Sequence, residues 1–389
     1  MKHAVYIVDA WRTPFCRSGS EMAALTAQDL AVQGLAPALQ RVPEMPGLAD
    51  VLMGNVLSGR GNLARYGLLG AGFPVSVPGS TVDRQCASGL DAVAQAFCRA
   101  AATEEPMSFV AGGVESMSTA PYPMARATRA YDRSPPKFLD IPLSPPSIGD
   151  PSMIDTAETV SAEAGISRED MDRFALSSHR KALAAMSEGR FDREIVPIRI
   201  SGARGREISI DTDVGPRADT DLEKLSSLAP VVAGGCVSAG NASGIADGAA
   251  AVVVMNEAAV KSAGLTPLAR IRSTACVGVD PLRMGLGPVP AVQLLLKQEG
   301  VPLSSIGWWE INEAFAGQVL AVARALHLAP EQINADGGAI ALGHPLGASG
   351  ARIAGHLSHC LASRPSGTKG IATLCVGGGM GMAMLMETP

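Results

Sequence analysis

Residues 334–350 read NADGGAIALGHPLGASG, a run of small residues around a single histidine, His344. Glycine allows backbone turns and close approaches that other residues exclude, so this run predicts a tight loop that leads into a helix. An imidazole in such a loop can accept a proton, or donate a hydrogen bond to an oxygen that gains negative charge. The alternative interpretation is a loop histidine that bonds its own backbone.

The end of this run has a counterpart elsewhere in the chain. Residues 347–350 read GASG and residues 86–89 read CASG, and each tetrapeptide adjoins an alanine-rich stretch with helical spacing. We interpret this as a sign of two similar halves, each with a glycine turn entering a helix.

The remaining pattern alternates apolar, β-type runs with helical ones. We expect helices to begin near Thr26 and near Ser167, where side chains can cap them, and a helix to stop at Gly300. Further helices are expected at 89–101, 291–298 and 315–326. Strands are expected at 5–8, 51–57, 108–114, 193–200, 249–255, 309–312, 370–375 and 382–386, with another starting at 268. This alternation predicts an α/β fold with parallel-type sheets covered by helices.

Prolines crowd residues 119–151, and such density is incompatible with helices or inner strands. We therefore expect an inserted loop domain at 116–246. The predicted division is a first half at 1–115 plus 247–267, the insertion, and a second half at 268–389.

Composition excludes several classes of protein. The 389 residues carry a net charge of only −5, and the absence of a dense Lys/Arg cluster argues against nucleic acid as a partner. We find no signal-peptide pattern and no apolar run long enough to span a membrane, so we expect a cytoplasmic protein without a membrane partner.

Seven cysteines occur at positions 16, 86, 98, 236, 276, 360 and 375. An odd number without a C-x-x-C pair argues against a disulfide framework and against a zinc site. Most are expected to be small buried hydrophobic residues.

Two cysteines have unusual surroundings. Cys86 precedes an expected helix start, where free N–H groups would lower the pKa of the thiol and favour a nucleophile; a buried structural cysteine is the alternative. Cys375 ends an apolar strand and is followed by Val376 and three glycines, whose N–H groups could bind an oxyanion. The spacing does not fit G-x-G-x-x-G, because Met382 occupies the place of the third glycine, so a dinucleotide site is disfavoured. Asn312 lies at a strand-to-helix junction, where it either has a chemical role or caps the helix.

Taken together, these segments resemble the thiolase family of acyl-CoA C-acyltransferases over nearly the whole chain. The resemblance rests on Arg12 to Pro14, the cysteine segment at 86, Gly240 to Ala250, Asn312 to Ala316, Gly337 to Gly350 and Cys375 to Gly381. It implies a five-layered αβαβα thiolase fold of two similar halves with an inserted loop domain. It also implies homodimers or homotetramers, coenzyme A or acyl-CoA as substrate, no tightly bound cofactor and no metal.

The resemblance also assigns catalytic roles. Cys86 would attack the keto carbon of a 3-oxoacyl-CoA in a ping-pong reaction that releases acetyl-CoA, or in reverse would condense acetyl-CoA with an acyl-CoA. His344 would take the Cys86 proton and, with a water held by Asn312, stabilise the enolate. The N–H groups of Cys86 and Gly377 would form a second oxyanion hole, and Cys375 would be the second acid/base.

Contacts to coenzyme A follow from the same resemblance. Ser243 and Met284 would lie along the pantetheine, Met153 near the acyl end and Arg217 near the adenosine phosphates. The chain departs from the family pattern at four positions, which are Asp83, Ser152, Lys224 and Asp336.

Two alternatives remain at this point. One is another condensing enzyme of the same superfamily, against which Cys375 and the glycines after it argue. The other is a non-catalytic acyl-CoA or lipid-binding protein, although all four polar catalytic positions are intact. Acyl-chain length and the direction of the reaction stay open, with fatty acid β-oxidation as the expected setting.

Overall fold

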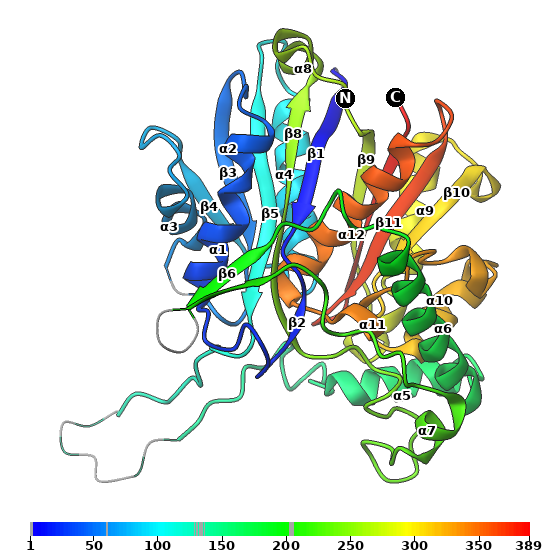
Figure 1. The fold of residues 1–389 in the computed structure, drawn as a ribbon. Helices are drawn as coiled ribbons and strands as arrows, with labels where there is room; N and C mark the ends of the chain where they lie inside the picture. Colours follow the sequence, from blue (N-terminus) through cyan, green and yellow to red (C-terminus); the bar gives the residue numbers. More distant parts are fainter. Residues whose placement is uncertain are drawn as a thin grey trace.

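The computed structural model describes residues 3–59, 61–127, 129, 131, 135, 137–201 and 206–389. Within these residues the largest element is a ten-stranded mixed sheet with the order β10-β11-β12-β9-β1-β8-β5-β3-β4, and β2 pairs with β8 (Figure 1). The strands are β1 (Val5–Arg12), β2 (Cys16–Arg17), β3 (Leu48–Gly54), β4 (Gly79–Val82), β5 (Ser108–Ser116), β8 (Ala246–Asn256), β9 (Ala269–Gly278), β10 (Ile306–Ile311), β11 (Lys369–Val376) and β12 (Met380–Glu387).

The sheet has two parts, joined where Val5–Ile7 of β1 pair with Ala269–Ile271 of β9. Helices α4 (Ser88–Ala100) and α12 (Leu346–Ala362) pack between the two parts, in one apolar core with strand residues of both. Helices α1 (Ala27–Leu35) and α3 (Leu63–Gly70) cover one outer face, and α9 (Pro288–Glu299) and α10 (Ala316–Ala325) cover the other. The order helix, sheet, helix, sheet, helix confirms the predicted five-layered α/β fold.

The expectation of parallel-type sheets is only partly right. The pairs β3–β4, β3–β5 and β10–β11 are parallel, while the other pairs are antiparallel. One reason is local: β11 and β12 are joined by a short glycine turn, which forces an antiparallel hairpin.

The remaining elements lie around this framework. The helices are α2 (Pro37–Arg41), α5 (Met153–Glu163), α6 (Arg168–Ser187), α7 (Leu222–Ser227), α8 (Glu257–Ala263) and α11 (Ala339–Leu342). The 3-10 helices are η2 (Pro281–Leu286), η3 (Leu303–Ser305) and η4 (Pro330–Gln332), and β6 (Ile198–Ser201) pairs with β7 (Glu207–Ile210) in a separate ribbon. Among the described residues between Ser116 and Met153 there is no helix or strand, as the prolines predicted. The division of the chain into three units stays a prediction.

The tetrapeptides 86–89 and 347–350 meet where α4 crosses α12. A β-carbon on Gly89 would lie 2.6 Å from the carbonyl oxygen of Gly347, and one on Gly350 would lie 2.4 Å from the backbone nitrogen of Leu90. Only glycine permits this approach, so the N-termini of α4 and α12 lie at one place. The GASG tetrapeptide lies inside the first turns of α12, not before the helix as expected.

Helix ends follow the predicted signals. Thr26 and Ser167 each form a capping box, with Asp29 and Asp170 respectively, and Gly300 ends α9 in the left-handed conformation at φ 64°. No helix among the described residues has the length and apolar character required to cross a membrane.

Several strand predictions are wrong in extent: the strand expected at 51–57 is β3, which ends at Gly54, and that expected at 309–312 is β10, which ends at Ile311. Strand β1 does not end at Val8 but continues, through an irregularity between Ile7 and Asp9, as far as Arg12. The expected strand at 193–200 is reduced to β6, because residues 194–196 instead bond Arg12 at the end of β1: Arg12 N–H donates to Glu194 O at 2.7 Å and Val196 N–H donates to Arg12 O at 2.8 Å.

Candidate active site

Cys86 lies in a strained turn at the entrance to α4. The preceding residue, Gln85, has a positive φ of 47°, and its N–H donates to the Asp83 carboxylate at 2.9 Å. Asp83, one of the four residues that depart from the family pattern, therefore stabilises the turn that carries the Cys86 thiol. Two backbone N–H groups, those of Cys86 itself and of Gly377, point at the sulfur.

The predicted lowering of the Cys86 pKa is wrong. Burial raises the pKa of the thiol to about 11, and the hydrogen bonds from the two N–H groups only partly oppose this. The desolvation of a thiolate in this partly closed pocket outweighs the dipoles at the helix start. At neutral pH the sulfur consequently keeps its proton.

Cys375 lies beside Cys86, at the end of β11. Its side chain is buried, and both burial and the negative charge of a Cys86 thiolate raise the pKa of its thiol. The turn that follows has Gly378 at φ 83° and Gly379 at φ 86°, conformations that leave the Gly377 N–H free to face Cys86. Leu143, from the proline-rich segment, covers this turn: a β-carbon on Gly378 would lie 2.9 Å from its carbonyl oxygen.

His344 is buried in the loop between α11 and α12. Its Nδ1 lies 2.5 Å from the Ser349 hydroxyl, which in turn donates to Pro345 O at 2.8 Å. Because the Ser349 hydroxyl donates its only proton to Pro345 O, it can only accept from Nδ1. Nδ1 must therefore carry a hydrogen, and Nε2 has a free lone pair. Burial, assisted by the Arg352 charge, lowers the pKa of His344 to about 4, so the ring is neutral.

Asn312 faces His344 across the site. Its amide nitrogen lies 3.4 Å from His344 Nε2, and its backbone N–H donates to Thr373 O at 3.0 Å, which extends the parallel β10–β11 pairing. The alternative in which Asn312 caps α10 is wrong, since the N-cap of that helix is Phe315. Within the described part of the chain, the buried Oδ1 of Asn312 has no hydrogen-bond partner, so it can accept one from a water or a substrate.

Two buried carboxylates that the sequence analysis did not assign hold the His344 loop. Glu313 accepts from Ser178 Oγ at 2.6 Å, Asn334 Nδ2 at 2.8 Å and Ile340 N–H at 3.1 Å. Glu115 accepts from Gly347 N–H, at the start of α12, at 3.0 Å, and from the N–H groups of residues 56–58. Their positions directly after the expected strands 108–114 and 309–312 were the only signal in the sequence.

Two of the residues predicted to contact coenzyme A lie next to Cys375. Met284, Ala314 and Cys375 form one buried apolar cluster, against which Met153 and Phe315 pack. The structure thus joins η2, α5 and β11 in one apolar wall beside the two thiols.

A cavity of about 300 Å³ extends toward the His344 loop from the surface. Its lining includes Gly343, next to His344, and three cationic side chains, Arg17, Arg217 and Lys224, with a single acid, Asp219. This excess of positive charge suits a phosphate-bearing ligand. Arg217 was predicted, Lys224 is one of the departures, and Arg17 was missed; burial and the neighbouring Arg217 charge lower the Arg17 pKa.

Ser243 lies in the Gly240–Gly244 turn whose glycines help to line this cavity, and its N–H donates to Ala314 O at 3.0 Å.

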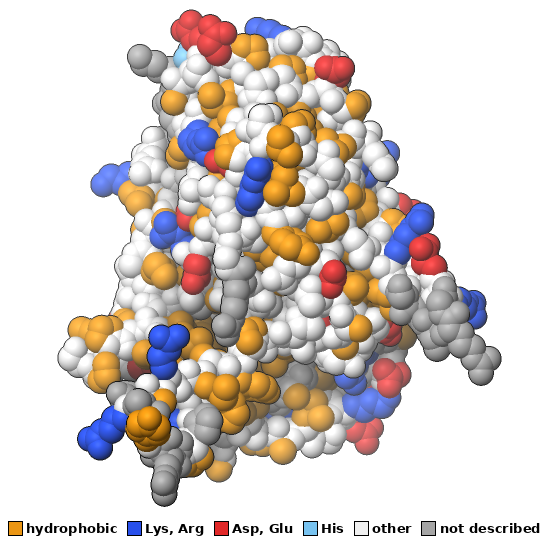
Figure 2. Space-filling model, turned by 90° about the vertical axis from the view of Figure 1, so that its left-hand side faces the viewer, with side chains coloured by type: hydrophobic (Ala, Val, Ile, Leu, Met, Phe, Trp, Pro, Cys, Tyr) orange, Lys and Arg blue, Asp and Glu red, His pale blue; other side chains and the backbone are white. Residues whose placement is uncertain are grey.

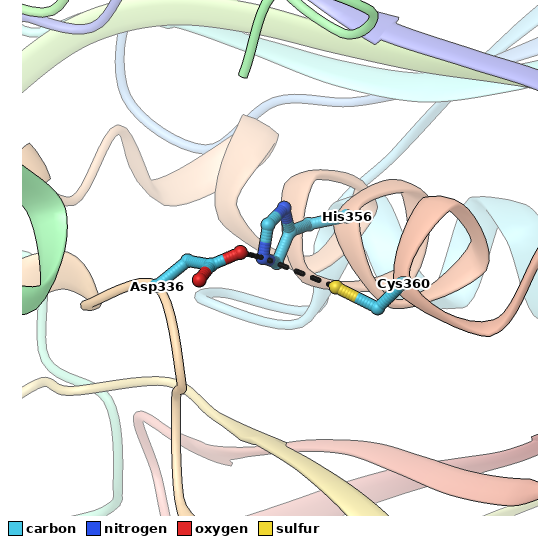
Figure 3. Close-up of side chains that lie close together, drawn as sticks. All are labelled: Asp336, His356 and Cys360. Atoms are coloured by element: carbon cyan, nitrogen blue, oxygen red, sulfur yellow. Dashed lines mark hydrogen bonds and ion pairs between the residues drawn. The ribbon is translucent and has the colours of Figure 1, made fainter. Parts of the chain in front are cut away.

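Two of the departures from the family pattern have structural roles. Ser152 caps α5, with its hydroxyl 2.8 Å from the Asp155 carboxylate. Asp336 lies apart from the two thiols, in a buried group of charges around His356 (Figure 3).

The expectation that most cysteines are buried is wrong. All seven lie in the described residues with free thiols, but only Cys16 and Cys375 are buried, whereas Cys98 and Cys276 are exposed. A small side chain such as cysteine tolerates either environment, here on α4 for Cys98 and on β9 for Cys276, so composition alone did not distinguish them.

Comparison with known proteins places these features in a family. The model of the thiolase N-terminal domain matches residues 5–258, and that of the thiolase C-terminal domain matches residues 265–388. The chain is 45% identical to beta-ketoadipyl-CoA thiolase from Pseudomonas putida, an alignment that covers 98% of this chain and 99% of the relative.

Solved structures with names from the same family have the same fold as this chain. The acetyl-CoA acetyltransferase of Bacillus anthracis has a TM-score of 0.93 at 40% identity, covering 100% of this chain and 99% of the other. The human mitochondrial 3-ketoacyl-CoA thiolase in complex with CoA has a TM-score of 0.91 at 39% identity, covering 100% and 98%.

Proposed function

The chain belongs to the thiolase family, whose members are CoA-dependent acyltransferases, and we propose that it cleaves or forms 3-oxoacyl-CoA through an acyl intermediate on Cys86. The observation that carries this proposal is the convergence of backbone N–H groups from Cys86 and Gly377 on one sulfur. Two converging donors match the oxygen of a tetrahedral adduct at an acylated thiol.

The first proton transfer starts from two neutral groups. Because the pKa of Cys86 is about 11 and that of His344 about 4, no thiolate–imidazolium pair exists at rest. The thiol proton passes to His344 Nε2 as Cys86 Sγ attacks the 3-keto carbon of the bound thioester. The new oxyanion accepts hydrogen bonds from the Cys86 and Gly377 N–H groups.

Cleavage of the C2–C3 bond then leaves the enolate of acetyl-CoA. His344, now protonated on Nε2, and a water bound to Asn312 donate to the enolate oxygen. Cys375 gives its proton to C2, and acetyl-CoA leaves. The resulting Cys375 thiolate takes the proton of an incoming CoA thiol, whose sulfur attacks the acyl group on Cys86. The Cys86 sulfur leaves and recovers its proton from His344.

Coenzyme A would enter by the cavity at Arg17, Arg217 and Lys224, with its phosphates at the cationic end and its thioester at Gly343. Of the two methionines beside Cys375, Met153 would contact the acyl end and Met284 the pantetheine. Ser243, whose turn helps to line the cavity, would contact the pantetheine.

The substrate follows from the relatives only as a class. One is named a beta-ketoadipyl-CoA thiolase and another an acetyl-CoA acetyltransferase, so dicarboxylic and short-chain 3-oxoacyl-CoA esters are the two leading candidates. Thiolysis rates on acetoacetyl-CoA, 3-oxoadipyl-CoA and longer unbranched esters would separate these two from the β-oxidation role expected from sequence.

We also propose a cytoplasmic homo-oligomer, either a dimer or a tetramer. Figure 2 shows hydrophobic side chains on the face that includes the open β4 edge, and the exposed ones near this edge include Tyr66, Leu69 and Val75. Tyr122, Phe138 and Ile141 of the proline-rich segment are also exposed. An unpaired edge beside apolar side chains is a typical interface. A monomeric mass in light scattering would refute this.

Trapping the intermediate tests the reaction. After incubation with acetyl-CoA and acid quenching, peptide mass mapping should find the acetyl group on Cys86. Cys375→Ser should still be acetylated but should not form acetoacetyl-CoA, because it lacks the proton acceptor for C2. Cys98→Ser, an exposed thiol away from the site, is the control and should behave as the native chain. An acetyl group on any other cysteine would disprove the assignment.

A further inference from the structure

A second cluster of reactive side chains lies away from the two thiols of the active site. Asp336, at the start of the His344 loop, faces His356 and Cys360, which lie one turn apart on α12 (Figure 3). His356 Nε2 lies 3.3 Å from Asp336 Oδ2 and 3.5 Å from Cys360 Sγ. The three ligand atoms all lie within 4.8 Å of one another.

A further carboxylate oxygen lies beside His356, at the border of this cluster. Oε1 of Glu310, on β10, lies 3.9 Å from His356 Nε2. The Glu310 side chain is fully buried and, among the residues that the structure describes, its Oε1 has no hydrogen-bond partner. Burial of a carboxylate oxygen without a hydrogen-bond donor costs free energy of folding, and a bound cation next to Glu310 Oε1 would offset that cost.

From this geometry we propose that Glu310, Asp336, His356 and Cys360 form a binding site for a divalent metal ion, with Zn²⁺ as the preferred ion. Bonds of about 2.0–2.3 Å to tetrahedral zinc place ligand atoms about 3.3–3.6 Å apart, which matches the two shorter distances. A set of thiolate, imidazole and carboxylate ligands favours zinc over magnesium or calcium. Binding would displace the protons of the Cys360 thiol and of His356 Nε2 to solvent.

The proposed ligands are themselves held by hydrogen bonds and ion pairs, as metal ligands in proteins usually are. His356 Nδ1 donates to Glu194 at 2.8 Å, which leaves Nε2 to face the cluster, and Glu194 is itself held by Arg12 at 2.6 Å. The second oxygen of each carboxylate is also engaged: Arg352 contacts Glu310 Oε2 at 3.3 Å, and Arg190 contacts Asp336 Oδ1. Such partners orient metal ligands and tune their affinity.

The absence of a C-x-x-C pair excludes only a zinc site whose cysteines are close together in the sequence. Here the ligands come from β10, from the loop before His344 and from α12, and only His356 and Cys360 share the i, i+4 spacing of one helix face. The ion would tie together the elements that carry Asn312 and His344. Cys360 is partly exposed, which gives the site access from solvent.

Metal retention by the whole protein tests the proposal. After chelator treatment, addition of ZnCl₂ and gel filtration, elemental analysis should find one zinc per chain in the native protein and in Cys86→Ser, which removes the reactive thiol. Asp336→Asn and Cys360→Ser should each lower the zinc affinity at least about 100-fold, because changes to outer ligands alone cost up to about 100-fold. Cys98→Ser is the matched thiol control and should retain zinc.

Cobalt provides a readout independent of activity. Co²⁺ in the native protein should show thiolate-to-metal charge-transfer absorption, which Cys360→Ser removes and Cys86→Ser keeps. Circular dichroism of each variant would verify folding, and the two variants change different ligands on different elements. Failure to retain zinc, or a cobalt–thiolate band that survives in Cys360→Ser, would show that the cluster is only a buried ion-pair network. Neither result depends on the proposed thiolase reaction.

Discussion

The hydroxyl of Ser349 sets which nitrogen of His344 carries the proton at rest. It accepts from Nδ1 and donates to Pro345 O, which leaves the lone pair of Nε2, the proposed base, facing Asn312. A neutral histidine without this partner can exchange tautomers and rotate, and then its free lone pair no longer faces Asn312.

We therefore expect Ser349→Ala to lower kcat about 10-fold or more with little change in KM, since general acid–base catalysis contributes about 100- to 10,000-fold. Ser358→Ala is the matched control, because Ser358 is also buried in α12 and its hydroxyl bonds only a backbone carbonyl, Gly355 O. Steady-state kinetics on both variants measures the difference. Equal losses would mean that the effect is structural and that Ser349 does not orient His344.

The raised pKa of Cys86 predicts how its alkylation depends on pH. The thiolate is the reactive form, and below a pKa of about 11 its fraction rises about tenfold per pH unit. In the absence of substrate, the rate of iodoacetamide labelling at Cys86 should climb steadily from pH 6 to pH 9. Peptide mapping is needed to separate Cys86 from the exposed Cys98 and Cys276. A plateau that begins near neutral pH would instead reveal a preformed thiolate–imidazolium pair.

At the scale of elements, the crossing of α4 and α12 brings together the segments that carry Cys86 and His344, the proposed nucleophile and base. Cys86 precedes α4, His344 precedes α12, and the two helices touch through glycines at positions 89, 347 and 350. A side chain at the contact would push the helix starts apart and so separate the groups that they carry.

Gly350→Ala should destabilise the protein by about 1–3 kcal/mol, as overpacking does, and should reduce activity, because its β-carbon would lie 2.4 Å from Leu90 N. Gly355→Ala, in the same helix, meets the Ala10 β-carbon at 3.1 Å and Val252 Cγ1 at 3.6 Å, and gains up to about 1 kcal/mol of helix propensity. Thermal unfolding with an activity assay compares the pair. If Gly350→Ala were as stable and as active as Gly355→Ala, the close crossing would not matter.

At the scale of the whole molecule, the features that could be predicted from the sequence are those that depend on neighbouring residues, such as helix caps and glycine-rich loops. Thr26 and Ser167 marked the starts of their helices, and glycines marked the loops of His344 and Cys375. The five layers and the catalytic roles were expected only from the resemblance to the thiolase family. Contacts between distant segments could not be predicted: Glu115 bonds Gly347 across 232 residues, and no local pattern records it. The Cys86 pKa was misjudged for the same reason, because burial depends on the assembled fold.

The charge of the cavity is a further property of the assembled molecule, since Arg17, Arg217 and Lys224 come from separate segments of a chain with a net charge of −5. If phosphates of coenzyme A bind there, Lys224→Glu should raise the KM for CoA about 3- to 10-fold and leave kcat unchanged, because exposed charge pairs contribute up to about 1 kcal/mol each. Lys297→Glu, an exposed lysine on α9, carries the same change of net charge and should have little effect. Added salt should shrink the difference between the two variants, since it screens exposed charges. An equal rise in KM in both variants would show that net charge alone acts and that the phosphates bind elsewhere.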